Sequence, residues 1–229
     1  MSLMRSSCAI AALIVIAWPP VARADDRRPY IGAGAMLTVQ GSHPPSPNSP
    51  DFPRTGVGGV AVGLTAEVGG FLSASVSIAF EASLPTRFTS VQETDYSIVF
   101  RDENRHRDEI FSGLFGFHLP KRGGFGAVII AGPSVVREDT LRRTAYQTGL
   151  PGVGTGEFGP FGAEYSVGRW TIGVSGGVDL AFDVGARVSV VPQVRVHWIE
   201  RSAVDGSFSG SLGLSSWVIR PAIVVRMRF

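Results

Sequence analysis

A two-residue alternation between apolar side chains and small or polar ones recurs along most of this 229-residue chain. From Leu72 to Glu81, apolar side chains occupy the even positions, whereas serine, alanine and glutamate occupy the odd ones. The same alternation runs through residues 170–180, 187–198 and 217–229. Because successive side chains of a β-strand point to opposite faces of a sheet, this pattern predicts strands with one apolar and one polar face.

Connection lengths give a second signal, because short and long connections alternate along the chain. Weaker segments at residues 30–39, 57–68, 109–119 and 125–136 bring the number of predicted strands to about eight. Tight turns are expected at 69–70, 120–124 and 183–185, and long polar loops at 40–56, 82–108, 137–164 and 200–213. If consecutive strands pair, all short turns and both termini lie at one end of the sheet, and the long loops lie at the other.

A soluble sandwich would also alternate, so other features have to decide between a soluble and a membrane protein. The polar positions are rich in glycine, serine and alanine, which suits a narrow barrel interior. Aromatic residues gather near segment ends, as in the interfacial girdles of membrane barrels: Tyr30, Phe71, Trp170, Trp198, Trp217 and Phe229. We therefore predict an all-β fold, a closed antiparallel up-and-down transmembrane β-barrel of about eight strands.

Two prolines count against continuous strands. Pro192 and Pro221 fall inside predicted segments, and proline has no backbone N–H to donate to a sheet. We expect β-bulges or local strand ends at both positions.

The N-terminus has the features of a cleaved signal peptide. Arg5 supplies a positive charge, residues 8–18 are apolar, and Ala22 and Ala24 form a small-x-small cleavage site. The apolar run of about eleven residues is shorter than the roughly 20 that a membrane-spanning helix needs. Cys8 begins this run instead of following the cleavage point, which argues against a lipidated cysteine. We therefore expect residues 1–24 to be removed and residues 25–229 to form one barrel domain.

Charge and composition exclude several function classes. Without Arg5 and Arg23 the basic residues number 19, equal to the 19 acidic ones, so no nucleic-acid partner is expected. Beyond Cys8 there is no cysteine to form a disulfide or a thiolate metal site. Residues 101–109 alternate in charge sign, which favours a solvated loop or strand extension over a metal site. The glycines of residues 149–159 lack the strand-to-helix context of a phosphate loop, and no cofactor is expected.

Charged residues also occupy the polar parity, which faces the interior of the predicted barrel. They are Glu67, Glu81, Asp179, Arg187, Arg195, His197, Arg220 and Arg226. Charges removed from water are costly unless they are paired, and an eight-strand barrel has room only for interdigitated side chains. The pattern predicts a charge-paired, filled lumen. A narrow proton or ion channel is the alternative.

Across residues 25–229, this arrangement resembles the small outer-membrane barrels of the OmpA/OmpX type. Ile223, Val225, Met227 and Phe229 resemble the C-terminal signal by which the barrel-assembly machinery recognises its clients. The resemblance implies a place in the outer membrane among lipid and lipopolysaccharide, and a transient contact with that machinery. Our first hypothesis is a structural or surface-interaction role, carried by the long loops, and the sequence predicts no particular oligomeric state.

His197 raises the alternative of a membrane-embedded lipid-modifying enzyme. Lipid A deacylases are small outer-membrane barrels with a strand-borne histidine, followed two positions later by a serine. Here Ile199 occupies that position, and Glu200 and Ser202 come later. We therefore expect no catalytic residue, and a structural or surface role for His197.

Overall fold

The computed structural model describes residues 28–42, 58–95, 99–121, 124–146, 159–162, 164–201 and 214–229. It contains nine strands: β1 (Tyr30–Ser42), β2 (Gly59–Phe71), β3 (Val76–Pro85), β4 (Phe88–Asp95), β5 (Val99–His118), β6 (Phe125–Tyr146), β7 (Tyr165–Asp183), β8 (Val188–Ile199) and β9 (Leu214–Arg228). The predicted signal peptide, with Ala22 and Ala24, lies outside the described residues. Within the described ranges no helix has the length and apolar character to cross a membrane.

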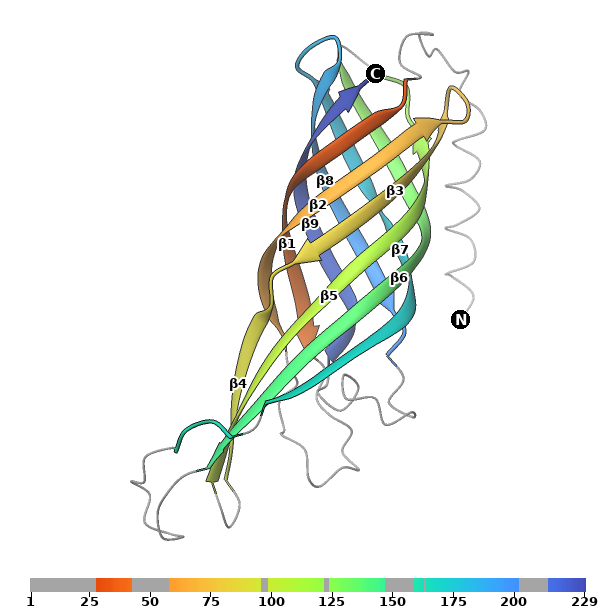
Figure 1. The fold of residues 1–229 in the computed structure, drawn as a ribbon. Helices are drawn as coiled ribbons and strands as arrows, with labels where there is room; N and C mark the ends of the chain where they lie inside the picture. Colours follow the sequence, from red (N-terminus) through yellow and green to blue (C-terminus); the bar gives the residue numbers. More distant parts are fainter. Residues whose placement is uncertain are drawn as a thin grey trace, which may run out of the picture.

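The nine strands form one closed antiparallel sheet. Their order is β3-β2-β1-β9-β8-β7-β6-β5-β4, and a further pairing of β3 with β5 closes the ring. The strands β3 and β4 follow each other along the same neighbour, since β3 pairs with β5 up to Ile110 and β4 pairs with it from His106. They are two parts of one interrupted strand, so the wall is an eight-strand barrel (Figure 1), as predicted.

The interruption between β3 and β4 is held against β2. The backbone N–H and hydroxyl of Thr86 both donate to the Val62 carbonyl, at 2.7 and 2.8 Å. The inward parity changes there, because Leu84 is exposed on β3 whereas Phe88 is buried on β4. The prediction of a loop over residues 82–108 was therefore wrong, since most of that stretch is strand.

Short turns gather at one end of the barrel, which we call the turn end. The β2–β3, β5–β6 and β7–β8 connections lie there, and the pairing of Tyr30 with Arg228 brings both ends of the described barrel to the same side (Figure 1). The predicted turn at 69–70 was misplaced. The strand β2 continues through Phe71, and the turn closes when the N–H groups of Leu72 and Ser73 donate to the Val76 carbonyl, at 2.9 and 3.0 Å.

At the opposite end, which we call the projecting end, several strands continue beyond the barrel. The strand β6 reaches Tyr146, although the sequence predicted a loop from residue 137, and β4 and β5 extend alongside it (Figure 1). Those strands and the first part of β7 form the projecting sheet. The other predicted long connections include residues 43–57, 147–158 and 202–213, which lie outside the described residues.

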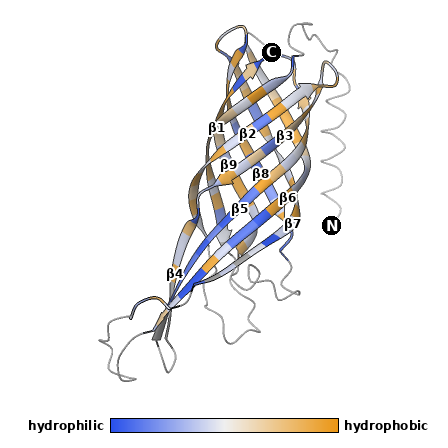
Figure 2. Ribbon diagram, in the orientation of Figure 1, coloured by the Kyte–Doolittle hydropathy of each residue, from blue (hydrophilic) through white to orange (hydrophobic). Residues whose placement is uncertain are grey.

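The outward parity of the barrel strands forms an apolar belt, and Figure 2 shows how hydrophobic positions concentrate on the barrel and hydrophilic ones on the projecting sheet. On β7 the belt runs from Trp170 to Phe182, with Ile172 and Val174 also exposed. Twelve residue steps of about 3.4 Å, tilted by roughly 45°, span about 29 Å. This height is close to the apolar band of about 25 Å on known membrane barrels.

Pro192 and Pro221 neither end their strands nor disturb the β8–β9 pairing, which is continuous past both. Each interrupts the pairing on the other side of its strand instead. The β7–β8 register skips from Asp179↔Gln193 to Phe182↔Val190, and the β1–β9 register skips from Met36↔Ala222 to Val39↔Ile219. The expected strand ends were wrong, because one-sided pairing accommodates a missing N–H.

Candidate functional site

Near the turn end, two arginines cross-link the interior of the barrel. Arg195 Nε donates to Glu81 Oε2 at 2.8 Å, and its Nη1 donates to Asp179 Oδ1. Arg226 donates from Nε to Glu67 Oε1, from Nη2 to Glu67 Oε2 at 2.9 Å, and also to Asp179 Oδ2. Asp179 therefore bridges the two guanidinium groups. The network joins β2, β3, β7, β8 and β9 in one cross-section.

Glycines on neighbouring strands make room for this network. A Cβ on Gly32 would lie 2.6 Å from Glu67 Oε1, and one on Gly69 would lie 2.5 Å from the Tyr30 ring. Tyr30 was predicted to belong to an interfacial girdle, which is wrong, because it is only 8% exposed. Its ring lies below the Arg226 guanidinium, whose Cζ is 4.9 Å from the ring centroid.

The middle of the barrel contains three serines and His197. Ser112 Oγ lies 2.9 Å from both Ser134 Oγ and Ser175 Oγ, and Ser175 Oγ lies 2.6 Å from His197 Nδ1. A hydroxyl beside an imidazole is the usual arrangement of an activated nucleophile. Here, however, Ser175 and His197 are both buried inside the barrel wall. A lipid outside that wall does not reach them.

Toward the projecting end a second buried network surrounds Asp108. His106 bridges Thr140 and Asp108, with Nδ1 2.7 Å from the Thr140 hydroxyl and Nε2 2.8 Å from Asp108 Oδ1. Arg201 Nη2 donates to Asp108 Oδ2, and Arg220 Nη2 donates to the Asp108 carbonyl, both at 2.5 Å. His106, Asp108 and Thr140 are at most 2% exposed, so this chain of hydrogen bonds also packs the interior.

Sequence reasoning missed this second network because residues 101–109 were interpreted as a solvated face. Only the odd positions face outward, where they are partly exposed. Asp102, Asn104, His106 and Asp108 are buried, so the interpretation was wrong for the even positions. Residues 101–109 are polar at both parities, so hydrophobic alternation gave no signal for the strand, and only the structure shows which positions are buried.

The structure places seven of the eight predicted lumen residues inside the barrel: Glu67, Glu81, Asp179, Arg195, His197, Arg220 and Arg226. Arg187 is the exception. It lies exposed in the turn before β8, which begins at Val188, so its predicted inward position was wrong. Gln193 also belongs to the network near the turn end, and Arg201 belongs to the network around Asp108, but the pattern singled out neither residue.

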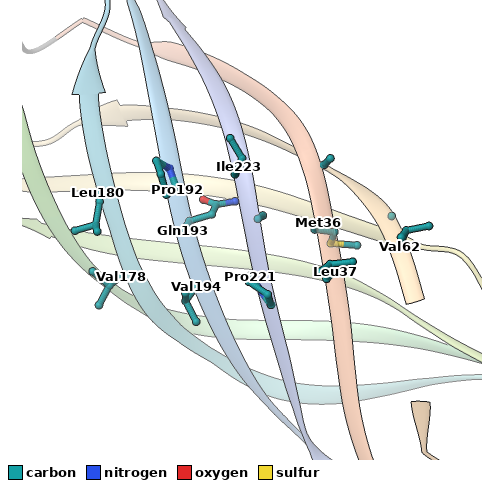
Figure 3. A pocket seen from close by; sticks show the side chains of 13 residues that line it. Met36, Leu37, Val62, Val178, Leu180, Pro192, Gln193, Val194, Pro221 and Ile223 are labelled. Atoms are coloured by element: carbon teal, nitrogen blue, oxygen red, sulfur yellow. The ribbon is translucent and has the colours of Figure 1, made fainter. Parts of the chain in front are cut away.

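The proposed assembly residues Ile223, Val225, Met227 and Phe229 are exposed on the outer surface at the turn end of β9. A shallow apolar groove of about 600 Å³ lies across the neighbouring strands (Figure 3). It runs over β7, β8, β9, β1 and β2, and outward residues such as Val62 and Leu180 line it together with Pro192 and Pro221. Among the described residues, no group of three His, Cys, Asp or Glu side chains is placed to hold a metal ion.

A closed eight-strand barrel with an apolar exterior is the architecture of small outer-membrane barrel proteins. No protein-family model and no curated protein sequence matches this chain. Among solved structures, it is similar to Ail, the attachment invasion locus protein of Yersinia pestis, solved with the heparin analogue sucrose octasulfate. The identity is 8%, the match covers 89% of this chain and 99% of Ail, and the TM-score is 0.47.

Two further structures have the same kind of likeness. A major outer membrane protein from Thermus thermophilus is 10% identical, with 86% of this chain and 99% of that chain covered and a TM-score of 0.47. Neisserial surface protein A is 13% identical, with 88% and 97% covered and a TM-score of 0.41. At these identities the likeness concerns architecture and carries no information on activity.

Proposed function

We propose that this chain is an integral outer-membrane protein whose filled barrel anchors the projecting sheet at the cell surface, in a structural or surface-interaction role. The observation that carries the proposal is the apolar belt, which continues around the closed wall while charged residues fill the interior. Water disfavours an exposed apolar area of this size, whereas hydrocarbon accepts it. A closed barrel also leaves no unpaired sheet edge in the hydrocarbon.

The interior favours an anchor over a channel. Salt bridges from Arg195 and Arg226 cross the lumen near the turn end, and the Asp108 network fills it toward the projecting end. Between them lies the hydrogen-bonded cluster of Ser112, Ser134 and Ser175. These three successive layers of bonded side chains fill the lumen and cross-link its wall, which favours a rigid support over a channel. In planar bilayers we expect the folded protein to give no stepwise conductance.

The projecting sheet is the part that would meet partners. Its outward side chains on β5 are charged, with Arg101, Glu103 and Arg105 in succession, whereas Phe115 and Phe117 on the same strand belong to the belt. The sheet therefore continues into water. Strands that are already paired in a sheet present a defined surface without the ordering cost that a flexible loop pays on binding.

Topology labelling tests this proposal. Thr89→Cys lies exposed on the projecting sheet and Val184→Cys lies exposed in a turn at the turn end. In intact cells a membrane-impermeant maleimide should label Thr89→Cys only, and after lysis it should label both. Labelling of Val184→Cys alone in intact cells would contradict the orientation, and recovery of the protein in the soluble fraction would contradict membrane insertion.

A further inference from the structure

The edge of the apolar belt nearest the projecting end crosses β5, β6 and β7 as an abrupt change from apolar to charged side chains. The last apolar row holds three outward residues in register, Phe111, Val135 and Ile172. The next row toward the projecting end holds Glu109, Arg137 and Trp170. The Trp170 ring contacts Phe111, with 6.1 Å between centroids. Tryptophan is enriched at membrane–water interfaces, so this row marks the level of the lipid headgroups.

Five side chains at this level form a continuous chain of ion pairs, which we call the arginine cluster: Arg87, Asp139, Arg107, Glu109 and Arg137. Arg87 Nη2 and Arg107 Nε both donate to Asp139 Oδ2, at 2.6 and 3.1 Å. Arg107 Nη2 lies 3.1 Å from Glu109 Oε1, and Arg137 Nη1 lies 3.5 Å from Glu109 Oε2. The chain joins β5 and β6 to the residue that precedes β4.

The arginine cluster exposes its cations more than its anions, although all five side chains lie on the outer face of the sheet. The side chains of Arg87, Arg107 and Arg137 are 39, 30 and 49% exposed, whereas those of Asp139 and Glu109 are 11 and 13% exposed. Three guanidinium groups share two carboxylates, which leaves one excess positive charge. Each guanidinium has five N–H donors, more than these ion pairs use. The surface at the belt edge therefore offers charged donors held in place by buried acids.

We propose that the arginine cluster binds the phosphate groups of lipopolysaccharide in the outer leaflet. This inference rests on the proposed function, because it requires the projecting end to face outward. Guanidinium groups form charge-assisted, often bidentate, hydrogen bonds to phosphate. The lipid A phosphates are attached to the sugars that carry its acyl chains, so they lie just above the hydrocarbon, at the level of the cluster. Asp139 and Glu109 preorganise the guanidinium groups, which lowers the ordering cost of binding.

Native mass spectrometry of the purified full chain in detergent tests the proposal, with bisphosphorylated lipid A as the probe. The test variant is Arg107→Gln/Arg137→Gln. The matched control is Arg143→Gln, which lies farther along β6, is 31% exposed and pairs with Glu164. We expect the wild type and the control to retain lipid A equally, and the double variant to bind it about tenfold more weakly, equivalent to about 1.4 kcal/mol. Heat-modifiable electrophoretic migration verifies that each variant is folded.

Three outcomes would overturn the proposal. The first is equal retention of lipid A by the folded double variant and the wild type. The second is equal retention by the wild type of bisphosphorylated and dephosphorylated lipid A, since phosphate recognition would then be absent. The third is equal affinity for phosphatidylglycerol, which would make the site a general one for lipid phosphate. Each of these outcomes is independent of the labelling experiment, so membrane insertion would stand even if the cluster bound no lipopolysaccharide.

Discussion

Replacing Arg226 by methionine should destabilise the barrel strongly, because the substitution leaves the buried carboxylate of Glu67 without its ion-pair partner. Asp179 keeps its bond from Arg195, but Glu67, which is 6% exposed, loses both of the bonds that Arg226 donates to it. Breaking a buried ion pair by removing one partner costs about 3–5 kcal/mol, most of which is the penalty of the unpaired charge. We expect about 3 kcal/mol, at the lower end of this range, because Asp179 remains paired.

A second substitution distinguishes charge pairing from simple packing. Glu67→Gln removes the unpaired negative charge. The double variant Glu67→Gln/Arg226→Met should therefore be more stable than Arg226→Met alone, by roughly 1–2 kcal/mol. The matched control is Arg228→Met, on the same strand but at the rim, where Arg228 bonds Asp183 and Ser189. Partly solvated pairs of this kind contribute about 0–1 kcal/mol.

Equilibrium urea unfolding in lipid vesicles measures these differences. Trp170, Trp198 and Trp217 are exposed on the outer wall and report the transfer from lipid to water by fluorescence. The reasoning fails if Arg226→Met loses no more stability than Arg228→Met. It fails equally if the double variant is as unstable as Arg226→Met, since the cost would then not come from an unpaired carboxylate.

Other parts of the structure carry three further predictions. Gly132→Ala should cost about 1–3 kcal/mol in urea unfolding, because its Cβ would lie 1.8 Å from the Gly113 carbonyl oxygen, whereas Gly113→Ala has open space and should be nearly neutral. Burial alone would raise the pKa of Asp139, but its bonds from two arginines hold that pKa below 3.8. The contribution of the ionised Asp139 to stability is therefore complete above about pH 4 and is lost as the pH falls further. Asp139→Asn should make the free energy of unfolding less dependent on pH below about pH 4. His197→Ala should leave the lipid A of expressing cells unchanged by mass spectrometry, and a changed acylation pattern would restore the enzyme hypothesis.

Much of the barrel was predictable because side chains on the same face of a strand recur at every second residue, so a strand shows in the sequence as alternating apolar and polar residues. The outward positions of β7, β8 and β9 agree with the pattern from Trp170 onward, including the exposed Trp198 and Trp217. The projecting sheet was not predictable in this way. On β5 both parities are polar near His106 and Asp108, so hydrophobic alternation vanishes although the strand continues. Backbone pairing with β6 maintains the strand there.

The ends of elements were the other source of error. Arg187 has the parity of an inward residue, but β8 begins one residue later. Tyr30 has the inward parity of β1 and lies inside, although aromatic residues at strand ends usually belong to a girdle. In both cases the error came from assigning a residue by its type or parity without knowing the strand boundary.

The amino-acid sequence by itself determined which residues of β7, β8 and β9 face outward and which face the interior, because side-chain alternation is a local property of each strand. The tertiary structure alone decided which interior charges meet. Glu67 and Arg226 are 159 residues apart, and they pair only because β1 lies between their strands and carries Gly32 at that register position. Ser175 meets His197 through the β7–β8 register in the same way. Register and closure are collective properties of the whole sheet, and they turn separate inward charges into one filled lumen.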